Sequence, residues 1–571
     1  MINTLIVRIF RGIAQILEIK GENRFRVRAY DRAAGNIESL AEDIQLLISE
    51  GRLNEIPGIG PDLSAKIKEI ASTGKSGFFE ELKRTIPPGM LDLLNIPSVG
   101  AKTAKLLFEQ AGVRGIADLE AAIVKNKLQA ISGIKERTIE NIKRGIEVLK
   151  RGRERMSLAE ADNVADSFVG VLKGLPEITL LSVGGSLRRR KETVRDIDIL
   201  MVSDKPEKVM DAFVSLPQVK EILAQGKTKS SIRTSDDIQV DCRVVDGSSY
   251  GAALLYFTGS KNFNIKIRQL AIKKGLKINE YGVFKGERFI GGGTEAQIFS
   301  LLGLAYIEPE LREDTGEIEL AGKALLPRLI EEKDIIGDFH VHSHWSDGRD
   351  SVEQIIRACV RKGYSYVAIT DHSGSLKIAR GLDRAAVKKK KAQIKKANKG
   401  LKGFTVLFGA EVDIDSDGEL DYGPETLREF DIVIAAVHTG FKQSKERLTR
   451  RIIKACQNKY VHIIAHPTGK LKGQRDPYDI DFVEICRVAR ETNTALEVNS
   501  FPDRLDLNDI NCRYALEKGV RFSIDTDAHS LEHLDDMRYG VCVARRGWLR
   551  RKDVLNTLPL DKLLKGIKKS K

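Results

Sequence analysis

All nine histidines of this 571-residue chain lie at or beyond His340. Histidine is the commonest metal ligand in proteins, so any metal chemistry before His340 must depend on other side chains. Carboxylates are the main alternative, and they suit hard cations such as Mg²⁺. A typical domain has about 100–200 residues, so the chain is also long enough for several cores. The sequence therefore predicts a multidomain protein with a histidine-free part and a separate histidine-bearing part.

The charge balance and the cysteines narrow the class of protein. A net charge of +14 indicates attraction to polyanions, with DNA as the leading candidate and a merely soluble basic surface as the alternative. None of the six cysteines belongs to a CxxC pair, which is typical of reduced thiols inside the cell. Arg8 and Arg11 interrupt the N-terminal apolar segment, and no apolar run approaches the roughly 18 residues that span a bilayer. We expect a cytoplasmic protein without membrane contact.

Residues 1–150 are predicted to be almost entirely helical, with three similar turns at residues 56–60, 96–100 and 131–135. The pattern, hydrophobic-x-Gly-x-Gly between two helices, is typical of helix–hairpin–helix motifs, whose backbone N–H groups bind DNA phosphates without reading sequence. Ser98 replaces a glycine in the second turn, and Lys135 replaces one in the third. An ordinary helix–helix turn is the alternative for any single copy. The predicted DNA-binding residues are Gly58, Gly60, Gly100 and Lys102.

Three aspartates in the next segment form a second pattern. Asp196 and Asp198 lie two positions apart in a predicted strand, so their carboxylates point to the same face. Asp241, in a predicted strand at residues 237–246, can supply a third carboxylate. Three carboxylates without histidine suit two Mg²⁺ ions that clamp an in-line displacement. The alternative is a surface DxD beside a basic loop, but the spacing favours nucleotidyl transfer with these three aspartates as the catalytic ligands.

A glycine turn and a basic loop precede these aspartates. Gly185 and Ser186 can bind a triphosphate through N–H and hydroxyl groups. Arg189 can neutralise charge on the leaving pyrophosphate.

This segment resembles the palm of the family X DNA polymerases, the DNA polymerase beta group. Residues 256–260, YFTGS, match a turn of that family, and residues 276–281 resemble its thumb motif. The resemblance implies that Tyr256 and Phe257 lie near the sugar of the incoming nucleotide, and that Asn264 and Arg268 lie at the minor-groove side of the nascent base pair. It implies a nucleotide-binding set of Gly185, Ser186, Arg189, Tyr256, Phe257, Gly259, Asn264 and Arg268.

The first hairpin also resembles the small lyase domain of this family. Lys66 stands where that domain has its Schiff-base lysine, and a lysine amine can attack an aldehyde. Asp62, however, stands where the family example has a phosphate-binding lysine. A solvated helix lysine is the other interpretation of Lys66.

From residue 335 onwards, short apolar runs alternate with helical stretches, which predicts βα units around a parallel sheet. Histidines and acids follow these runs, where the strand ends of a βα barrel converge and active sites lie. Packing can explain one such histidine, but not six together with three acids. The predicted metal ligands are His340, His342, Asp347, His372, Glu411, His438, His466, Asp527 and His529. The basic run Lys388–Lys391 is predicted to be a solvated helix face.

Residues 335–571 resemble the PHP (polymerase and histidinol phosphatase) family almost throughout. The resemblance implies a distorted TIM-like barrel with up to three Mn²⁺ or Zn²⁺ ions, which can activate a water and hold a phosphodiester. A histidine often stands at the position of Asp347 in the family, so the third site is weaker or prefers Mn²⁺. The implied ligand sets are His340, His342, Glu411 and Asp527 for one metal, Glu411, His438 and His466 for a second, and Asp347, His372 and His529 for a third.

The two resemblances together are those of the bacterial and archaeal PolX type. The expected fold combines all-α helix–hairpin–helix modules, an α+β nucleotidyltransferase palm and thumb, and an α/β PHP barrel. The expected domains are a lyase-like domain (1–84), fingers (85–152), a palm (153–247), a thumb (248–318), a linker (319–334) and the PHP domain (335–571).

The implied function is template-directed, gap-filling DNA synthesis in base excision repair, with gapped or primer-template DNA and a dNTP as substrates. The barrel would supply 3′-5′ exonuclease activity and processing of abasic-site ends, and we expect a monomer. Two alternatives remain open: a nucleotidyltransferase that acts on RNA ends, and a DNA-binding protein whose barrel is a phosphatase for a small metabolite.

Overall fold

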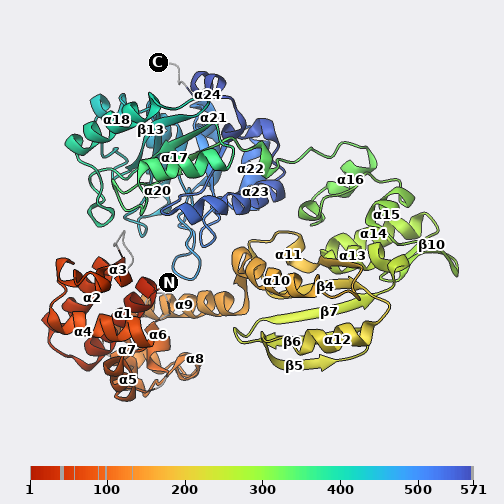
Figure 1. The fold of residues 1–571 in the computed structure, drawn as a ribbon, viewed down its shortest axis with the longest axis horizontal. Helices are drawn as coiled ribbons and strands as arrows, with labels where there is room; N and C mark the ends of the chain where they lie inside the picture. Colours follow the sequence, from red (N-terminus) through yellow and green to blue (C-terminus); the bar gives the residue numbers. More distant parts are fainter. Residues whose placement is uncertain are drawn as a thin grey trace. The chain divides into compact units, whose positions relative to one another are not determined.

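The computed structural model describes residues 2–38, 44–56, 58–87, 89–94, 96, 99–131 and 133–567 (Figure 1). Pro57, Pro97, Ser98 and Ser132 of the three predicted turns lie outside the described residues. The chain divides into two compact units. The first comprises residues 1–153 with the short segments 347–351 and 471–476, and the second comprises the remainder. Among the described helices, none is both long and apolar enough to cross a membrane.

The first unit is helical, as predicted from its helical stretches separated by glycine-containing turns. Phe10, Ile13 and Ile67 are fully buried in one core, and Leu93 and Leu107 are fully buried in a second. The first core includes Ile59 of the first predicted glycine turn, and the second core includes Val99 and Ile134 of the other two turns. The helices are α1 (Ile2–Lys20), α2 (Arg24–Glu38), α3 (Ile44–Ser49), α4 (Pro61–Thr73), α5 (Gly77–Arg84), α6 (Met90–Leu94), α7 (Ala101–Ala111), α8 (Ile116–Val124) and α9 (Glu136–Glu154).

The second unit begins with a five-stranded sheet in the order β2-β4-β7-β6-β5, which we call the palm. Strands β4 and β7 are parallel, and the other pairs are antiparallel. Ile197 and Ile199 point into a core that contains Phe168 and Phe213 of the covering helices. The elements are β1 (Met156–Ser157), α10 (Leu158–Leu172), β2 (Leu180–Val183), α11 (Gly185–Arg188), β3 (Thr193–Val194), β4 (Asp196–Val202), α12 (Pro206–Val214), β5 (Val219–Gln225), β6 (Lys229–Thr234) and β7 (Gln239–Val245).

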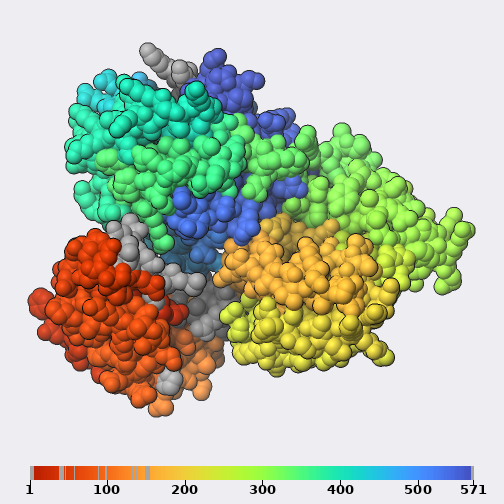
Figure 2. All heavy atoms as spheres, viewed as in Figure 1, coloured from red at the N-terminus to blue at the C-terminus, as the bar shows by residue number. Residues whose placement is uncertain are grey.

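Helices and a three-stranded sheet follow the palm and form the thumb. Its core contains Phe263, Ile298 and Phe299, all almost fully buried. In the space-filling view the palm, orange to yellow, and the thumb, yellow-green, form a continuous surface (Figure 2). The elements are α13 (Tyr250–Thr258), α14 (Lys261–Lys273), β8 (Lys277–Asn279), β9 (Gly282–Lys285), β10 (Arg288–Gly291), α15 (Glu295–Leu301) and α16 (Glu317–Gly322).

Residues 337–525 supply seven parallel strands, β11 to β17, that are neighbours in chain order. A parallel bridge between Val341 and Ala528 brings the last strand end to the first, so the barrel is nearly closed. Phe339 and Tyr366 stack inside it with ring centroids 5.6 Å apart. The strands are β11 (Gly337–Val341), β12 (Tyr366–Ile369), β13 (Thr405–Asp413), β14 (Ile432–Ala436), β15 (Ile463–Ile464), β16 (Ala495–Asn499) and β17 (Phe522–Asp525).

The predicted alternation of strands and helices is confirmed, with seven strands instead of the eight of a regular TIM barrel. The helices are α17 (Val352–Arg361), α18 (Arg384–Asn398), α19 (Pro424–Leu427), α20 (Lys445–Gln457), α21 (Phe482–Glu491), α22 (Asp509–Glu517), α23 (Met537–Arg546) and α24 (Leu560–Gly566).

Candidate active sites

The first candidate site is the carboxylate cluster on the palm. In the parallel pairing of β4 with β7, Asp198 stands directly opposite Asp241, and Asp196 lies two residues earlier on the same face. Ile197 and Val240 point the other way and are fully buried. Burial, together with repulsion from Asp196 and Asp241, raises the pKa of Asp198 to about 7. A divalent cation would relieve this repulsion, so the cluster fits the binding of hard cations.

A glycine turn lies against these carboxylates. Gly185 has a φ of +62°, and a Cβ at this position would overlap the carboxylate of Asp198. The backbone N–H of Gly184 donates to the carbonyl of Asp198 at 2.8 Å. Only glycine at position 185 allows the backbone to come this close to the carboxylate of Asp198. The close contact places the start of α11, with Ser186, beside the aspartates.

Arg189 connects this turn with the end of α13. Its Nη1 donates to the carbonyl oxygen of Thr258, and its Nε donates to Glu313 at 3.0 Å. The guanidinium of Arg243 lies over the ring of Phe257, 4.4 Å from the ring centroid. Arg243 also acts to lower the pKa of Asp198, yet the sequence reasoning did not select it. Its position two residues after Asp241 on β7 was the available signal.

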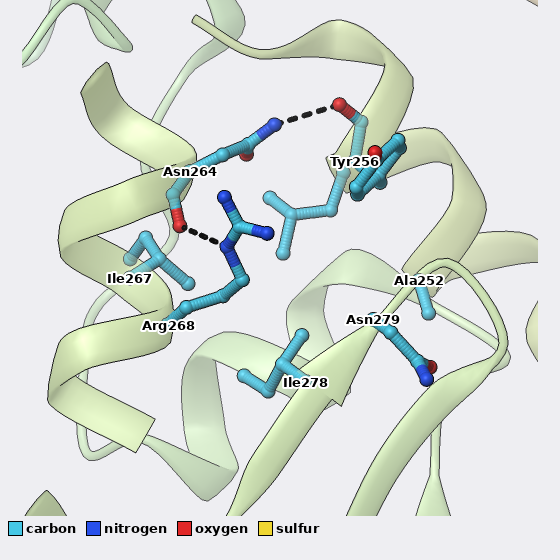
Figure 3. A pocket seen from close by; sticks show the side chains of 8 residues that line it. Ala252, Tyr256, Asn264, Ile267, Arg268, Ile278 and Asn279 are labelled. Carbon is cyan, nitrogen blue, oxygen red and sulfur yellow. Dashed lines mark hydrogen bonds between the residues drawn. The ribbon is translucent and has the colours of Figure 1, made fainter. Parts of the chain in front are cut away.

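A narrow pocket in the thumb brings together three predicted nucleotide-binding residues (Figure 3). Asn264 Nδ2 donates to the carbonyl of Tyr256 at 2.7 Å, and Arg268 Nε donates to the carbonyl of Asn264 at 3.2 Å. Asn279, which stands in the thumb motif, also lines this pocket. Gly259, with a φ of +69°, approaches Arg189. The predicted nucleotide set therefore lies along α11, α13 and α14.

The crowding of the palm carboxylates leads to a prediction about stability. Because the pKa of Asp198 is raised in the folded state, the ionised form of this side chain opposes folding. The free energy of unfolding therefore falls as the pH rises from about 4 towards about 7. We expect Asp198→Asn to stabilise the metal-free protein at pH 8, by at most about 4 kcal/mol, because three pKa units correspond to that free energy. Unfolding in urea with EDTA at pH 8 measures the gain. At pH 5 the gain should fall to less than half of its value at pH 8, because the carboxyl group is then protonated in the folded state. An equal gain at both pH values would contradict the explanation.

The second candidate site lies at the strand ends of the barrel and is centred on Glu411. Its Oε2 lies 2.8 Å from His372 Nδ1 and 3.4 Å from His340 Nε2. Its Oε1 lies 3.1 Å from His466 Nε2 and 3.3 Å from His438 Nε2. Burial opposes ionisation of Glu411, but the surrounding histidines outweigh it and hold its pKa well below the usual range.

Asp527 forms the other acidic centre of this site. Its Oδ1 lies 3.2 Å from His342 Nε2 and 3.4 Å from His340 Nε2. Asp527 and His466 both have positive φ values, +54° and +29°. Such strained backbone in residues other than glycine is concentrated at functional sites. Burial first, and then Arg504, lower the pKa of His466 to about 3, so its ring stays neutral as a metal ligand must.

Carboxylates behind the histidines fix their orientation. Glu497 Oε1 lies 2.6 Å from Nδ1 of His340, and Asp413 is hydrogen-bonded to Nδ1 of His438. In both histidines Nε2 is therefore the atom turned towards Glu411, as is usual for metal-binding histidines. The sequence reasoning missed Glu497 and Asp413. Asp413 could have been found, since it lies two residues beyond Glu411 on β13.

The structure brings the predicted barrel ligands together, but it groups them somewhat differently. Three groups have ligand atoms within 4.8 Å of one another. His342 lies in two groups, and His372 lies with Glu411 as well as with Asp347. His466 reaches the cluster through Glu411. The groups are His342, Asp347, His372 and His529; His340, His342 and Asp527; and His372, Glu411 and His438.

The prediction of a solvated face at Lys388–Lys391 is wrong for Lys390, which is 1% exposed. Its Nζ lies 2.8 Å from Asp371 and donates to the carbonyls of Ile369 and Gly409 at 2.8 and 3.0 Å. Asp371 in turn accepts from the backbone N–H of Ser343 at 2.8 Å. Because Asp371 precedes His372, this buried pair supports the loop that carries a predicted ligand. A charge run gives no signal for such a buried partner.

Each of the three predicted hairpin turns contains the same type of backbone hydrogen bond. The N–H groups of Ile59, Val99 and Ile134 each donate to the carbonyl three residues earlier, at 3.0, 2.9 and 3.1 Å. Gly60 and Gly100 are the N-caps of α4 and α7, and both are exposed. The remaining predicted residues of this set, Gly58 with a φ of +80° and Lys102, are exposed as well.

Lys66 is not a simply solvated lysine. Its Nζ lies 2.5 Å from Asp62 and 5.2 Å from the centroid of the Phe78 ring. The side chain is only 16% exposed. The amine of Lys66, which would attack an aldehyde, is thus paired with Asp62, the residue that stands in place of the family's phosphate-binding lysine.

Family models match four parts of the chain. They are described as a helix-hairpin-helix domain (residues 1–76), a SAM-like helix-hairpin-helix tandem (90–147), a DNA polymerase beta thumb (253–313) and a PHP domain (338–501).

Three relatives illustrate how the parts combine. DNA polymerase lambda of Rattus norvegicus is 26% identical over 336 residues, 53% of this chain and 54% of its own. A probable phosphatase of Thermoanaerobacter sp. (strain X514) is 29% identical over 234 residues, 39% of this chain and 91% of its own. DNA polymerase/3′-5′ exonuclease PolX of Bacillus subtilis (strain 168) is 39% identical over 559 residues, 97% of both chains. Because this identity extends over both candidate sites and nearly the whole length, the chain belongs to the PolX family of family X DNA polymerases with a C-terminal PHP domain.

Proposed function

We propose that this chain is a template-directed DNA polymerase that fills short gaps during repair, and that its barrel is a metal-dependent 3′-5′ exonuclease. The observation that carries the proposal is the presence of two separate ligand clusters, one of carboxylates on the palm and one of histidines and acids in the barrel. The relative that matches nearly the whole chain is named for both activities.

In the polymerase reaction, Ser186 and the start of α11 would bind the triphosphate of the incoming dNTP, and Arg189 would neutralise charge on the departing pyrophosphate. Tyr256 and Phe257 would lie against the sugar. Asn264 and Arg268 would contact the minor-groove side of the new base pair. Asp196, Asp198 and Asp241 would hold two Mg²⁺ ions, which supply charge neutralisation and alignment for the in-line displacement.

In the barrel, the nine predicted ligands would hold Mn²⁺ or Zn²⁺, up to three ions, whose role is to activate water against a phosphodiester. Glu497 and Asp413 would keep Nε2 of His340 and His438 in place. Arg504 lies 3.4 Å from Asp527, and its buried Nη1 has no hydrogen-bond partner among the described residues. We assign to Arg504 the binding of the scissile phosphate.

Gly58, Gly60, Gly100 and Lys102 would hold the backbone of gapped or primer-template DNA in the first unit. The domain limits would be those set by the sequence, although α16 extends into the expected linker. Abasic-site processing belongs to the barrel, while lyase activity at Lys66 is opposed by its ion pair with Asp62. We propose a cytoplasmic monomer, and the six buried cysteines agree with a reducing compartment.

Extension of a primer at a one-nucleotide gap tests the polymerase assignment against a nucleotidyltransferase for RNA ends. The chain should add the templated dNTP and prefer it to the matching NTP by at least about tenfold, which needs only about 1.4 kcal/mol at the sugar. Single-turnover rates with both nucleotides on the same gapped duplex measure the preference. Untemplated addition to single-stranded RNA, or an equal rate with NTP, would contradict the assignment.

A phosphatase that acts on a small monoester is the second candidate for the barrel, because the probable phosphatase matches 39% of this chain over 91% of its own length. Incubation with p-nitrophenyl phosphate and, separately, with a 3′-labelled duplex separates the two candidates. Nucleotide release from DNA supports the exonuclease. Phosphate release from the monoester without nucleotide release supports the phosphatase.

A further inference from the structure

The basic segment at the C-terminal end of α11, residues 188–191, is not free to bind DNA as a patch. Arg188 pairs with Glu295 at 2.7 Å, and Arg190 is bidentate on Asp162 at 2.6 and 2.7 Å. Arg189 is paired with Glu313. Each arginine of the run therefore has a fixed acidic partner, and the loop is a rigid support for α11.

The backbone of this loop closes α11 with a tight turn. The N–H of Lys191 donates to the carbonyl of Ser186 at 3.1 Å, and the N–H of Arg190 donates to Leu187 at 2.9 Å. Arg190 adopts the left-handed conformation that such turns require, with a φ of +56°. This arrangement leaves the carbonyl of Arg189, at the C-terminal end of α11, available to an external donor.

That donor comes from the barrel. Arg546, the last residue of α23, donates from Nη1 to the carbonyl of Arg189 at 2.8 Å and to Glu313 Oε1 at 3.2 Å. Its Nε donates to Asp509 at 2.8 Å, and its side chain is 3% exposed. Four residues earlier on α23, Cys542 accepts from Nε of Arg190 at 3.1 Å. The barrel thus contacts both the backbone and the side chains of the loop.

Glu313 links the two arginines. Its Oε1 accepts from Arg189 Nε at 3.0 Å and from Arg546 at 3.2 Å, with Lys191 at 3.7 Å. Burial raises the pKa of Glu313, but Arg189 and then Arg546 outweigh this effect and lower it, so the carboxylate remains charged. Arg189 and Arg546 are therefore held by one shared anion. A cation at the end of a helix also interacts favourably with its dipole.

We propose that Arg546 of the barrel is a positioning residue for the polymerase reaction, because it holds the end of α11 and Glu313 so that Ser186 and Arg189 are preset for the triphosphate. This inference rests on the proposed role of Ser186 and Arg189. The barrel then has two separate tasks, degradation at its own metal cluster and support of nucleotide binding at the palm.

The test is Arg546→Gln in the full-length protein, with the dNTP concentration varied on a one-nucleotide gap. We expect the apparent Kd for dNTP to rise about tenfold, or about 1.4 kcal/mol. The maximal rate should change far less, and nucleotide release without dNTP should be unchanged. Arg546→Lys should recover part of the loss, since lysine retains the charge but not the fork of donors.

Arg545→Gln is the matched control. Arg545 lies next to Arg546 and also pairs with the segment before Glu313, through Glu310 at 2.7 Å. It donates to the carbonyl of Ile330 at 3.0 Å, and among the described residues it makes no hydrogen bond to α11 or to Arg189. A dNTP Kd near that of wild type in this variant, with the rise only in Arg546→Gln, supports the inference. An equal rise in both, or a matching loss of nucleotide release, would mean a general loosening of the fold and would overturn it.

Ser186→Ala and Arg189→Ala separate the inference from the function on which it rests. If these two variants weaken dNTP binding and Arg546→Gln does not, the inference is wrong and the proposed site stands. If neither of the two weakens dNTP binding, the triphosphate site itself has been misassigned.

Discussion

Replacing Asp198 with alanine is expected to reduce primer extension by on the order of 10³-fold or more, a loss of about 4 kcal/mol of transition-state stabilisation. Asp198 is the central member of the palm cluster, beside Asp196 on β4 and opposite Asp241 on β7. Its removal takes away the carboxylate that lies between the other two. Single-turnover incorporation of one dNTP into a one-nucleotide gap, with Mg²⁺ or Mn²⁺, measures the effect.

Asp204→Ala provides the matched control, since Asp204 is exposed and lies just beyond β4. Its extension rate should stay within a factor of about two of wild type, as expected for a surface substitution. An Asp198→Ala protein that retains more than a tenth of wild-type extension would contradict the assignment of the palm site. Loss of nucleotide release in Asp196→Ala or Asp198→Ala would contradict the independence of the two sites.

Glu411→Gln is expected to abolish the barrel reaction, with a fall in nucleotide release on the order of 10³-fold or more. Four histidines lie within 3.4 Å of the Glu411 carboxylate, so this side chain is shared by most of the cluster. Glutamine preserves the size but removes the charge that the cations require. The bound metal measured after gel filtration should fall together with the rate, while primer extension should remain near wild type.

Glu419→Gln is the control for this substitution. Glu419 is an exposed glutamate that follows β13, and it pairs with Lys454 at 2.5 Å. Its metal content and nucleotide release should equal those of wild type. Full nucleotide release by Glu411→Gln would show that the degradation of DNA does not take place at this cluster.

Much of the fold was predictable because its patterns are local. The strand–helix alternation after residue 335 and the glycine turns before residue 150 each depend on neighbours in sequence. The juxtaposition of Asp196 and Asp198 follows from the period of a strand, and the structure adds the register that places Asp241 opposite Asp198. The barrel ligands were recognisable because they follow apolar runs, whose ends meet on one face.

The partners of these residues were not predictable, since they come from distant parts of the chain. Lys390 is buried against Asp371, and a lysine run gives no local sign of such a partner. Arg189 meets Glu313, and Arg546 joins them from the far end of the sequence. The division of the barrel ligands among metals also depends on three-dimensional distances, which place His342 and His372 in two groups each.

The most direct test of two independent active sites is one labelled primer on a one-nucleotide gap with Mn²⁺, followed with and without dNTP. Wild type should extend the primer when dNTP is present and shorten it when dNTP is absent. Asp198→Ala should lose extension alone, and His342→Ala should lose shortening alone. Loss of both reactions in either variant, with the protein still folded by its thermal unfolding transition, would contradict the account.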